Sequence, residues 1–451
     1  MTKVLLISTY DLGRQPFGLA SPAAFLRRAG HHVTCVDTTR TELTADAVRA
    51  AELVAFFLPM HTATRLALPL IDRVREDNPT ARICAYGLYA PLNQAVLREH
   101  GVEWVLGPEF EEDLTQLATP VELGRYVATA ATTAGVTAAR RVPFIQPDRS
   151  DLPPLARYAT LQAGDRRKVV GYTEATRGCK HRCRHCPIVP VYDGRFRAVP
   201  VDVVIADIRA EAAAGAEHIT FGDPDFFNGP THAIAIVDAL AREFPDVTYD
   251  VTIKIEHLRQ HSELLPRLVD TGCAFVTSAV ESIDNEVLAK LEKGHTRADF
   301  EAVVARCAAI GLPLSPTFVA FTPWTTVESY REMLDAIERL ALVGAVAPIQ
   351  YAIRLLVPQG SRMLELEDVR DTISHFDPRS LTNIWHHADP RVDALQKEIE
   401  RLVGQRLTAP RAEMFRRVRE IACTAAGVAA PLQPPRVARA AVPYLNEPWY
   451  C

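Results

Sequence analysis

The most informative segment of the chain reads Arg177-Gly178-Cys179-Lys180-His181-Arg182-Cys183-Arg184-His185-Cys186-Pro187. Its three cysteines are spaced C-x3-C-x2-C, and thiols at this density indicate metal ligands rather than core residues. A four-iron cluster normally takes four cysteine thiolates, so three ligands leave one iron with an open position. An open coordination position is also what separates catalytic from structural zinc. The spacing alone therefore predicts a metal site.

Two other interpretations of these cysteines are weaker. A zinc knuckle would use His181 or His185 as a fourth ligand, but its ligands usually come as two separated pairs, and the sequence has no second pair. A disulfide is disfavoured because odd, clustered cysteines without a signal peptide indicate a reducing compartment.

Cys179, Cys183 and Cys186 match the cluster signature of the radical SAM enzymes, and the chain resembles that family. The resemblance implies a [4Fe–4S] cluster whose fourth iron is chelated by the amino and carboxylate groups of S-adenosylmethionine (SAM). It also implies that one electron from the cluster breaks a carbon–sulfur bond of the sulfonium. His185 stands where the family often has an aromatic residue near the adenine, although simple loop packing explains it equally well.

The cysteine segment is also basic, and the four residues responsible are Arg177, Lys180, Arg182 and Arg184. Positive charge beside an anionic cluster should ease its reduction. A solvated loop that docks an acidic electron donor, such as flavodoxin or ferredoxin, is equally compatible with these charges.

Composition excludes several classes of protein. The 451 residues suggest two or three domains, and 48% hydrophobic and 23% charged residues are ordinary for a globular protein. The net charge of −5 gives no basic field for nucleic acid, and no apolar run reaches the length of a membrane span. The start of the chain lacks the regions of a signal peptide, so we expect a cytoplasmic protein. Of the other cysteines, the first four lie in apolar patterns and are expected to be buried: Cys35, Cys84, Cys273, Cys307, Cys423 and Cys451.

Residues 1–120 alternate strand and helix signals. The expected strands are 3–8, 33–36, 53–58, 83–86 and 104–106. The expected helices are 45–51, 62–77, 92–99 and 109–117, together with one that Ser21 caps, that has Pro22 at its first position and that Gly30 closes. Because these strands are continuously apolar, both faces of the sheet should be buried, which predicts a doubly wound parallel sheet of the flavodoxin or Rossmann type.

This first domain resembles the cobalamin-binding domain that precedes the barrel in many B12-dependent radical SAM enzymes. The family's usual D-x-H-x-x-G loop is absent, and Asp11-Leu12-Gly13-Arg14-Gln15 stands in its place. Gly87-Leu88-Tyr89-Ala90-Pro91 replaces the open glycine-rich turn, and Leu88 and Tyr89 add bulk there. Cobalamin is therefore left open but not favoured, a vestigial or regulatory domain is preferred, and His61 is interpreted as a surface histidine rather than a cobalt ligand.

A proline-rich connector over residues 121–166 should be extended between domains. Residues 167–360 then repeat strand and helix six times, which predicts the partial (β/α)6 TIM-type barrel of the family. The expected strands are 168–176, 218–221, 247–253, 275–279, 314–321 and 350–356. The expected helices are 201–214, 231–244, 262–271, 298–310 and 327–342.

Chemistry in such barrels sits at the C-terminal ends of the strands, and the cysteine loop follows the first strand. Polar residues follow other strands, and the resemblance assigns SAM contacts to Gly222, Asp223, Lys254, Ser278, Glu281 and Arg354, with Asp225 and Glu256 as runners-up. Gly222 allows close backbone approach to the SAM amino group, Glu281 could bind the ribose diol, and Arg354 could pair the carboxylate. Acidic residues also cap the helix that follows a strand, and Asp223 could do only that.

Residues 361–451 should be helical, for example over 394–403 and 411–425, and should end in an extended tail that stops at Cys451. Trp385-His386-His387 is interpreted as a packing and capping feature rather than a metal site. The tail resembles the CUAEP/CCAEP-tail radical SAM subgroup, in which Cys451 would be the first of a vicinal pair and a selenocysteine codon would follow. An ordinary disordered terminus is the alternative.

The chain as a whole resembles the arsinothricin-forming members of this subgroup. That resemblance implies transfer of the 3-amino-3-carboxypropyl group of SAM to arsenite. Our own hypothesis is that Cys451, together with Cys423, helps to deliver the thiophilic arsenic. A cobalamin-dependent radical SAM methyltransferase is the second hypothesis, and a non-catalytic iron–sulfur sensor is the third.

Overall fold

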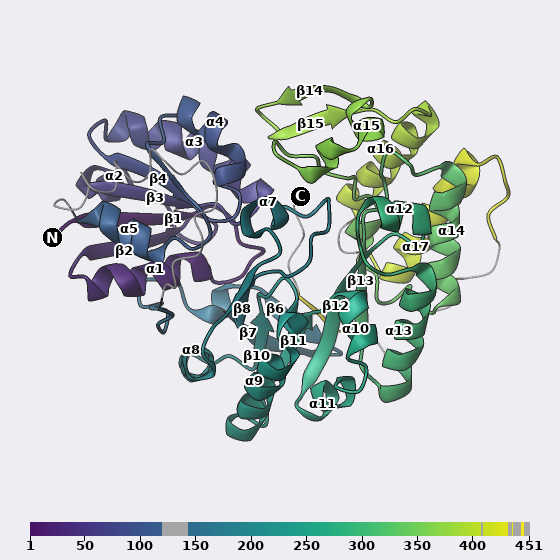
Figure 1. Ribbon diagram of the computed structural model, residues 1–451, viewed down its shortest axis with the longest axis horizontal. Helices are drawn as coiled ribbons and strands as arrows, with labels where there is room; N and C mark the ends of the chain where they lie inside the picture. The colour runs from purple at the N-terminus through teal and green to yellow at the C-terminus, as the bar shows by residue number, and fades with distance from the viewer. Residues whose placement is uncertain (120–142, 407–408, 432–434, 436–442, 446–451) are drawn as a thin grey trace.

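The computed structural model describes residues 1–119, 143–406, 409–431, 435 and 443–445. An N-terminal α/β domain lies beside a curled sheet with outer helices, and a helical C-terminal region packs against the far side of that sheet (Figure 1). Within the described ranges, no helix is long and apolar enough to cross a bilayer.

The N-terminal domain is a parallel sheet in the order β2-β1-β3-β4-β5, as its apolar strands predict. Its central strands are buried on both faces, and Leu6 and Ile7 are fully inaccessible. The strands are β1 (Lys3–Ser8), β2 (His32–Asp37), β3 (Leu53–Phe57), β4 (Arg82–Tyr86) and β5 (Trp104–Leu106). The helices are α1 (Phe17–Arg28), α2 (Ala45–Ala50), α3 (His61–Asp77), α4 (Gln94–Glu99) and α5 (Glu111–Ala118), with the short η1 (Pro91–Asn93) before α4.

The predicted start of the first helix is wrong. Helix α1 begins at Phe17, so Pro22 lies inside it rather than at its first position. A proline there cannot donate a hydrogen bond to the carbonyl four residues earlier, which belongs to Gly18. The Tyr86 hydroxyl donates to that carbonyl at 2.8 Å, so the missing bond is replaced from β4.

The second sheet has the order β13-β12-β11-β10-β7-β6-β16, and its strands from β7 to β13 are parallel neighbours in a curled half-barrel. These strands are β7 (Arg166–Thr173), β10 (His218–Phe221), β11 (Thr248–Thr252), β12 (Cys273–Glu281) and β13 (Leu314–Phe318). The helices are α8 (Val201–Ala213), α9 (Pro230–Glu243), α10 (Ile255–Gln260), α11 (Leu265–Asp270), α12 (Asn285–Lys290), α13 (Arg297–Ile310) and α14 (Val327–Arg339), and the short η3 (Phe226–Asn228) precedes α9.

The sixth strand expected over 350–356 is reduced to a single bridge between Phe321 and Arg354. Its first half is instead the short helix η4 (Pro348–Tyr351). The buried Gln350 side chain accepts a hydrogen bond from the Phe318 backbone amide at 2.8 Å. The Gln350 side chain therefore accepts the hydrogen bond from the Phe318 amide that a backbone carbonyl of a sixth strand would otherwise accept.

The connector contains regular structure, although its prolines predict an extended segment. After η2 (Leu155–Arg157), strand β6 (Thr160–Ala163) pairs antiparallel with β7. The chain end returns to this edge, where β16 (Tyr444–Leu445) pairs antiparallel with β6. The barrel sheet is thus extended on one side by two segments that are far apart in sequence.

The C-terminal region has the predicted helices α16 (Pro390–Gln405) and α17 (Arg411–Ala425). It also has elements that the sequence patterns do not predict: η5 (Arg362–Glu365), α15 (Glu367–Arg370) and the hairpin β14 (Ile373–Asp377)–β15 (Thr382–Trp385). The hairpin points toward the N-terminal domain (Figure 1). At its tip, Leu381 is fully buried within the hydrophobic core of that domain.

We predict that Leu381→Ala lowers the free energy of unfolding by about 2–5 kcal/mol, because it leaves a cavity where the hairpin enters the N-terminal core. Leu66→Ala is the matched control, since Leu66 lies on α3 of the same domain and is 48% exposed. Urea unfolding of both variants is the measurement. Equal small effects for the two substitutions would contradict the buried position of Leu381.

Candidate active site

The cysteine loop leaves the C-terminal end of β7 through the short strand β8 (Thr176–Gly178), which pairs antiparallel with β9 (Phe196–Ala198). Gly178 has φ of +78°, and a Cβ there would lie 2.5 Å from the Arg195 carbonyl oxygen. Only glycine fits this turn without a shift of the backbone. The loop therefore lies at the edge of the barrel where parallel strands present their functional residues.

The three cysteines have no disulfide partner, and Cys183 is buried while Cys179 and Cys186 are half-buried. Burial raises the pKa of the Cys179 thiol to about 12 and that of the Cys186 thiol to about 11. Among the described residues, these thiols are not gathered closely enough to share one metal ion. A zinc knuckle would need that gathering, whereas a [4Fe–4S] cube binds each thiolate through a different iron. The donor set fits the cube.

Three buried or half-buried ionisable side chains, Glu281, Lys293 and His185, lie next to Cys183 and Cys186. His185 Nε2 and Lys293 Nζ lie 3.0 and 3.4 Å from Glu281 Oε1. Burial opposes the ionisation of Glu281, but Lys293 and His185 outweigh it and lower its pKa to about 2. The two predicted residues Glu281 and His185 thus meet at the cysteine loop, and they share a lysine that sequence reasoning missed.

A second ion pair follows the next strand. Lys254 Nζ lies 2.8 Å from Glu256 Oε2 at the end of β11. The backbone of Gly294 approaches this pair so closely that a Cβ there would lie 2.4 Å from Glu256 Oε2 and 3.4 Å from Lys254 Nζ. Gly294 directly follows Lys293, the partner of Glu281. This contact therefore links the Lys254–Glu256 ion pair with the segment that carries Lys293.

Ser278 and His295 add polar atoms to the end of β12 and the loop after α12. Ser278 is fully buried, and its hydroxyl has no hydrogen-bond partner among the described residues. Neither ring nitrogen of His295 has a partner there, and burial lowers the pKa of His295 to about 4.

Gly222 and Asp223 have structural partners at the end of β10. A Cβ at Gly222 would lie 1.7 Å from the Tyr172 hydroxyl, so the glycine is needed for packing against β7. Asp223 accepts hydrogen bonds from the Ala175 amide at 2.9 Å and the Thr176 hydroxyl at 2.5 Å. It does not cap the helix after β10, which is the role of Asp225, whose carboxylate accepts the Phe227 amide. Asp223 instead fixes the segment that leads into the cysteine loop.

Arg354, predicted to pair the SAM carboxylate, has protein partners instead. Its guanidinium donates to Asp393 Oδ1 and to the Trp385 carbonyl, both at 2.7 Å, and stacks on the Trp385 ring. These contacts tie the chain after β13 to α16 and the hairpin. Trp385 is buried and donates from its ring nitrogen to the Leu355 carbonyl, which is the packing role expected for it.

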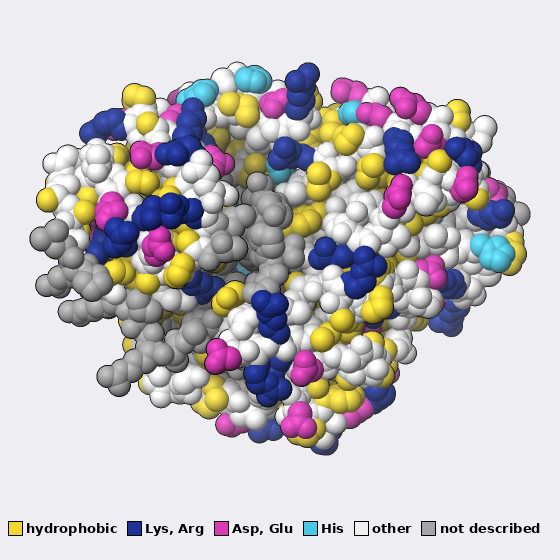
Figure 2. Space-filling model, turned by 180° about the vertical axis from the view of Figure 1, so that it is seen from behind, with side chains coloured by type: hydrophobic (Ala, Val, Ile, Leu, Met, Phe, Trp, Pro, Cys, Tyr) yellow, Lys and Arg dark blue, Asp and Glu magenta, His cyan; other side chains and the backbone are white. Residues whose placement is uncertain are grey.

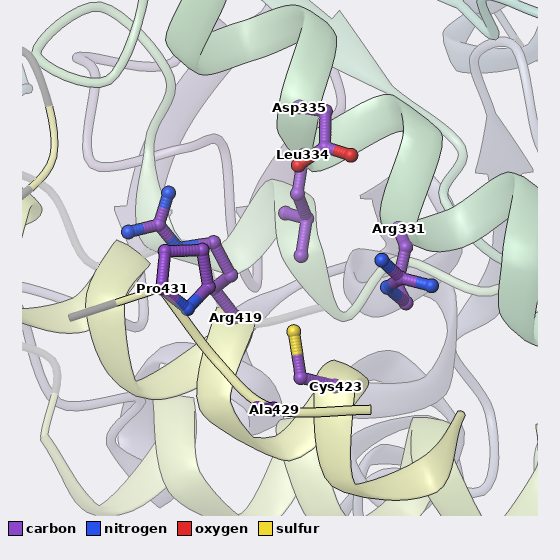
Figure 3. A pocket seen from close by; sticks show the side chains of 7 residues that line it. All are labelled: Arg331, Leu334, Asp335, Arg419, Cys423, Ala429 and Pro431. Carbon is purple, nitrogen blue, oxygen red and sulfur yellow. The ribbon is translucent and has the colours of Figure 1, made fainter. Parts of the chain in front are cut away.

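Cys423 does not join the cysteine loop. It is buried on α17, where its sulfur points toward Leu334 of α14 in a small cavity flanked by Arg331 and Arg419 (Figure 3). This cavity lies between two outer helices, so Cys423 is a packing residue here. Cys451 lies outside the described residues, and its part in arsenic delivery stays a prediction.

The basic residues of the loop are mostly paired. Arg184 Nη2 lies 2.5 Å from Glu292 Oε1, and Arg182 Nη2 lies 2.8 Å from Asp193 Oδ1. On the face shown in Figure 2, positive and negative side chains of the described residues are interspersed rather than gathered by sign. The loop charges therefore serve local ion pairs more than an extended basic surface.

Arg177 connects the loop to the N-terminal domain. Its guanidinium is 2.7 Å from Glu111 on α5 and 2.8 Å from Glu174, and it lies over the rings of Phe17 and Phe110. Burial opposes its charge, but the carboxylates hold the pKa of Arg177 well above its ordinary value. A buried charge of this kind is costly to leave unpaired, so the position of the loop depends on the N-terminal domain.

The chain's own hairpin contacts the ligand edge of the N-terminal sheet. In the order β2-β1-β3, ligands bind beyond the carboxyl ends of β1 and β3. His61, after β3, faces the Ser380 carbonyl at 2.5 Å, and burial lowers its pKa. Because the chain's own hairpin engages His61 and buries Leu381 nearby, this histidine is neither a free surface residue nor an available cobalt ligand.

Comparison with known proteins agrees with this geometry. Residues 173–340 match the radical SAM superfamily. The chain contains a radical SAM domain. This family implies a [4Fe–4S] cluster and SAM, for which Cys179, Cys183 and Cys186 are the fitting ligands.

Curated relatives are distant. The tRNA-2-methylthio-N(6)-dimethylallyladenosine synthase of Chlorobium luteolum is 27% identical over 47% of this chain and 51% of its own. The bacteriochlorophyllide d C-12(1)-methyltransferase of Chlorobaculum tepidum is 22% identical over 51% of this chain and 49% of its own. The chain spans about half the length of these relatives.

Two solved structures share the whole arrangement. The cobalamin-dependent radical SAM enzyme OxsB, with aqua-cobalamin and SAM bound, has a TM-score of 0.69 and 14% identity, covering 90% of this chain and 67% of its own. The methyltransferase TsrM of Kitasatospora setae, with tryptophan and a SAM analogue, has a TM-score of 0.61 and 20% identity, covering 81% and 76%. These similarities establish the fold of a cobalamin-type radical SAM protein.

Two functional candidates escaped sequence reasoning. Lys293 lies in an exposed-looking Leu-Glu-Lys-Gly-His run but is 3% exposed, and His257 lies on α10 and is fully buried. A positional signal was usable for His257, which closely follows β11, whereas Lys293 lies beyond α12 and gave no such signal.

We predict that Lys293→Met lowers the free energy of unfolding by about 3–5 kcal/mol, because it removes the buried ammonium group that pairs with Glu281 and leaves His185 as the remaining partner of that carboxylate. The double variant Glu281→Gln/Lys293→Met should recover most of this loss, and Glu286→Gln on the exposed face of α12 is the control. Because the folded pKa of Glu281 is depressed from 4.5, the contribution of the pair is complete above pH 4.5 and is lost as the pH falls toward 2. Urea unfolding at several pH values measures this; an additive double variant would contradict it.

Proposed function

We propose that this radical SAM enzyme transfers the 3-amino-3-carboxypropyl group of SAM to trivalent arsenic and forms a carbon–arsenic bond. The observation that carries the proposal is the N-terminal ligand edge, where the chain's own hairpin engages His61. A reaction that needs no corrinoid is consistent with that arrangement. The resemblance of the whole chain to arsinothricin-forming enzymes supplies the substrate.

Cys179, Cys183 and Cys186 would hold a [4Fe–4S] cluster, which would supply the one electron needed to cleave SAM. The side chains around the loop would position SAM. Lys293 and Lys254 place two buried ammonium groups near the loop, which suits the SAM carboxylate, and Glu281 suits the ammonium or the ribose diol. Which carbon of the sulfonium is cleaved then depends on orientation, because small displacements of a reacting atom change rates strongly.

The N-terminal domain would act as a support for the loop rather than as a cofactor carrier. Arg177 and Arg197 flank the cysteines and pair with Glu111 and Glu109 of that domain at 2.7 and 2.6 Å. Tyr192 donates to Glu109 from the same loop at 2.9 Å. These contacts would hold the cysteine loop in one position relative to the barrel.

Cobalamin-dependent methyl transfer is the second candidate. The fold likeness to OxsB and TsrM over most of the chain favours it. In this case a corrinoid would have to displace the hairpin tip from the ligand edge.

The nucleoside product separates these candidates. We expect the reconstituted, reduced protein to convert SAM to methylthioadenosine, at a rate that rises when arsenite is added, with chromatography and mass spectrometry as the measurement. Cys307→Ser keeps the reaction because Cys307 is buried in the barrel core, whereas Cys183→Ser abolishes it. Formation of 5′-deoxyadenosine and S-adenosylhomocysteine with retained corrinoid would establish the second candidate and refute the first.

A further inference from the structure

Three side chains meet beside the cysteine loop on its Cys179 side. His181 comes from the loop itself, Asp225 from the segment after β10, and His257 from α10 after β11. Among the described residues they are the one set of histidine, cysteine or acidic side chains, three or more in number, whose ligand atoms all lie within 4.8 Å of one another. Three separate strand ends therefore converge on one point.

The distances at this point suit ligands of a single ion. His181 Nε2 and His257 Nε2 are 3.1 Å apart, and Asp225 Oδ2 is 3.4 Å from His181 Nε2. Two nitrogens bound at about 2.1 Å to one ion are separated by roughly 3 Å when they occupy neighbouring coordination positions.

Two of these three side chains are fully removed from solvent. Asp225 and His257 are 1% and 0% exposed. Asp225 Oδ2 and His257 Nδ1 lie 2.7 Å apart, yet neither makes a hydrogen bond of acceptable geometry with the described residues. Unsatisfied polar atoms are rare in protein interiors, and Asp225 Oδ2 is the one of these two atoms that lies close to both histidines.

The surroundings are those of a metal-binding histidine. His181 Nδ1 lies 3.5 Å from Glu256 Oε2, and Lys254 holds that carboxylate in place. Metal-ligating histidines generally direct their second nitrogen to such a carboxylate, which fixes the ring orientation. The other oxygen of Asp225 is fixed as well, because it accepts the Phe227 amide at 3.1 Å.

We propose that His181, Asp225 and His257 bind one divalent transition-metal ion, separate from the three-cysteine site. Two imidazoles and one carboxylate form a donor set that suits Zn²⁺ or Fe²⁺ rather than Mg²⁺ or Ca²⁺. The ion ties the Cys179 arm of the loop to the ends of β10 and β11. It thereby fixes the loop from the barrel side, opposite the Arg177 contact with the N-terminal domain.

The test is metal binding by the reconstituted full-length protein under anaerobic conditions. Equilibrium dialysis with Zn²⁺ should give one ion per chain beyond the four irons, and Co²⁺ in the same site should show a visible spectrum without thiolate charge transfer. Asp225→Asn and His257→Asn should each weaken this binding at least 100-fold while iron stays at four per chain. Glu256→Gln should weaken it about 10–100-fold through the orientation of His181.

His261→Asn is the matched control, because His261 lies near His257 at the end of α10 but is not part of the three-residue set. It should retain one Zn²⁺. Absence of Zn²⁺ and Co²⁺ binding beyond the cluster, unchanged affinity in His257→Asn, or a thiolate band with Co²⁺ would each overturn the proposal. The wild-type stoichiometry and spectrum decide the question even if a variant fails to fold, and neither depends on the nucleoside that the enzyme produces.

Discussion

The buried ion pair between Arg177 and Glu111 is the constraint on which the site depends. It joins the residue two positions before Cys179 to the first turn of α5, so one contact spans the loop and the N-terminal domain. Removing Arg177 would leave the buried Glu111 carboxylate with the Ser21 hydroxyl as a partner, and removing Glu111 would leave Arg177 with Glu174, so either change weakens the pairing of a buried charge. The barrel side holds the same loop through Asp223, which accepts bonds from the Ala175 amide and the Thr176 hydroxyl. The cysteines are thus presented by a loop that is anchored on both sides.

This anchoring gives the N-terminal domain a structural role at the candidate site. Its α5 end contacts the loop, and its sheet edge receives the hairpin tip at Leu381. The hairpin is in turn tied to the barrel by Arg354, which bonds the Trp385 carbonyl and Asp393. The three regions of the chain therefore form a closed ring of contacts around the candidate site.

Sequence reasoning was reliable where one local pattern determines the structure. The apolar strands of both sheets are confirmed, because continuous burial leaves a strong signal, as in Lys3–Ser8. It was wrong where a distant side chain replaces a backbone hydrogen bond. Tyr86 allows Pro22 inside α1, and Gln350 takes the place of a ladder partner at the sixth barrel position. No window of the sequence near Pro22 or Gln350 contains that information.

The residues of the candidate site also fall into those that the sequence predicts and those that it does not. The cysteine spacing alone predicts a metal site, and the polar residues after strands predict that Glu281 and Lys254 lie near it. The partners that tune them could not be predicted, because Lys293 and His257 come into place only through tertiary packing. Arg354 and Cys423 show the opposite error, since residue type and approximate position suggested chemistry where the fold uses them for packing.

The central claim is that three thiolates leave one iron open for SAM. Electron paramagnetic resonance of the reduced protein, with SAM labelled at its amino nitrogen with ¹⁵N and its carboxylate carbon with ¹³C, tests this most directly. The account predicts four irons per chain and hyperfine coupling of both labels to the cluster. A protein whose three cysteines bind zinc in place of the cluster, or a cluster whose spectrum does not change on addition of labelled SAM, would contradict it.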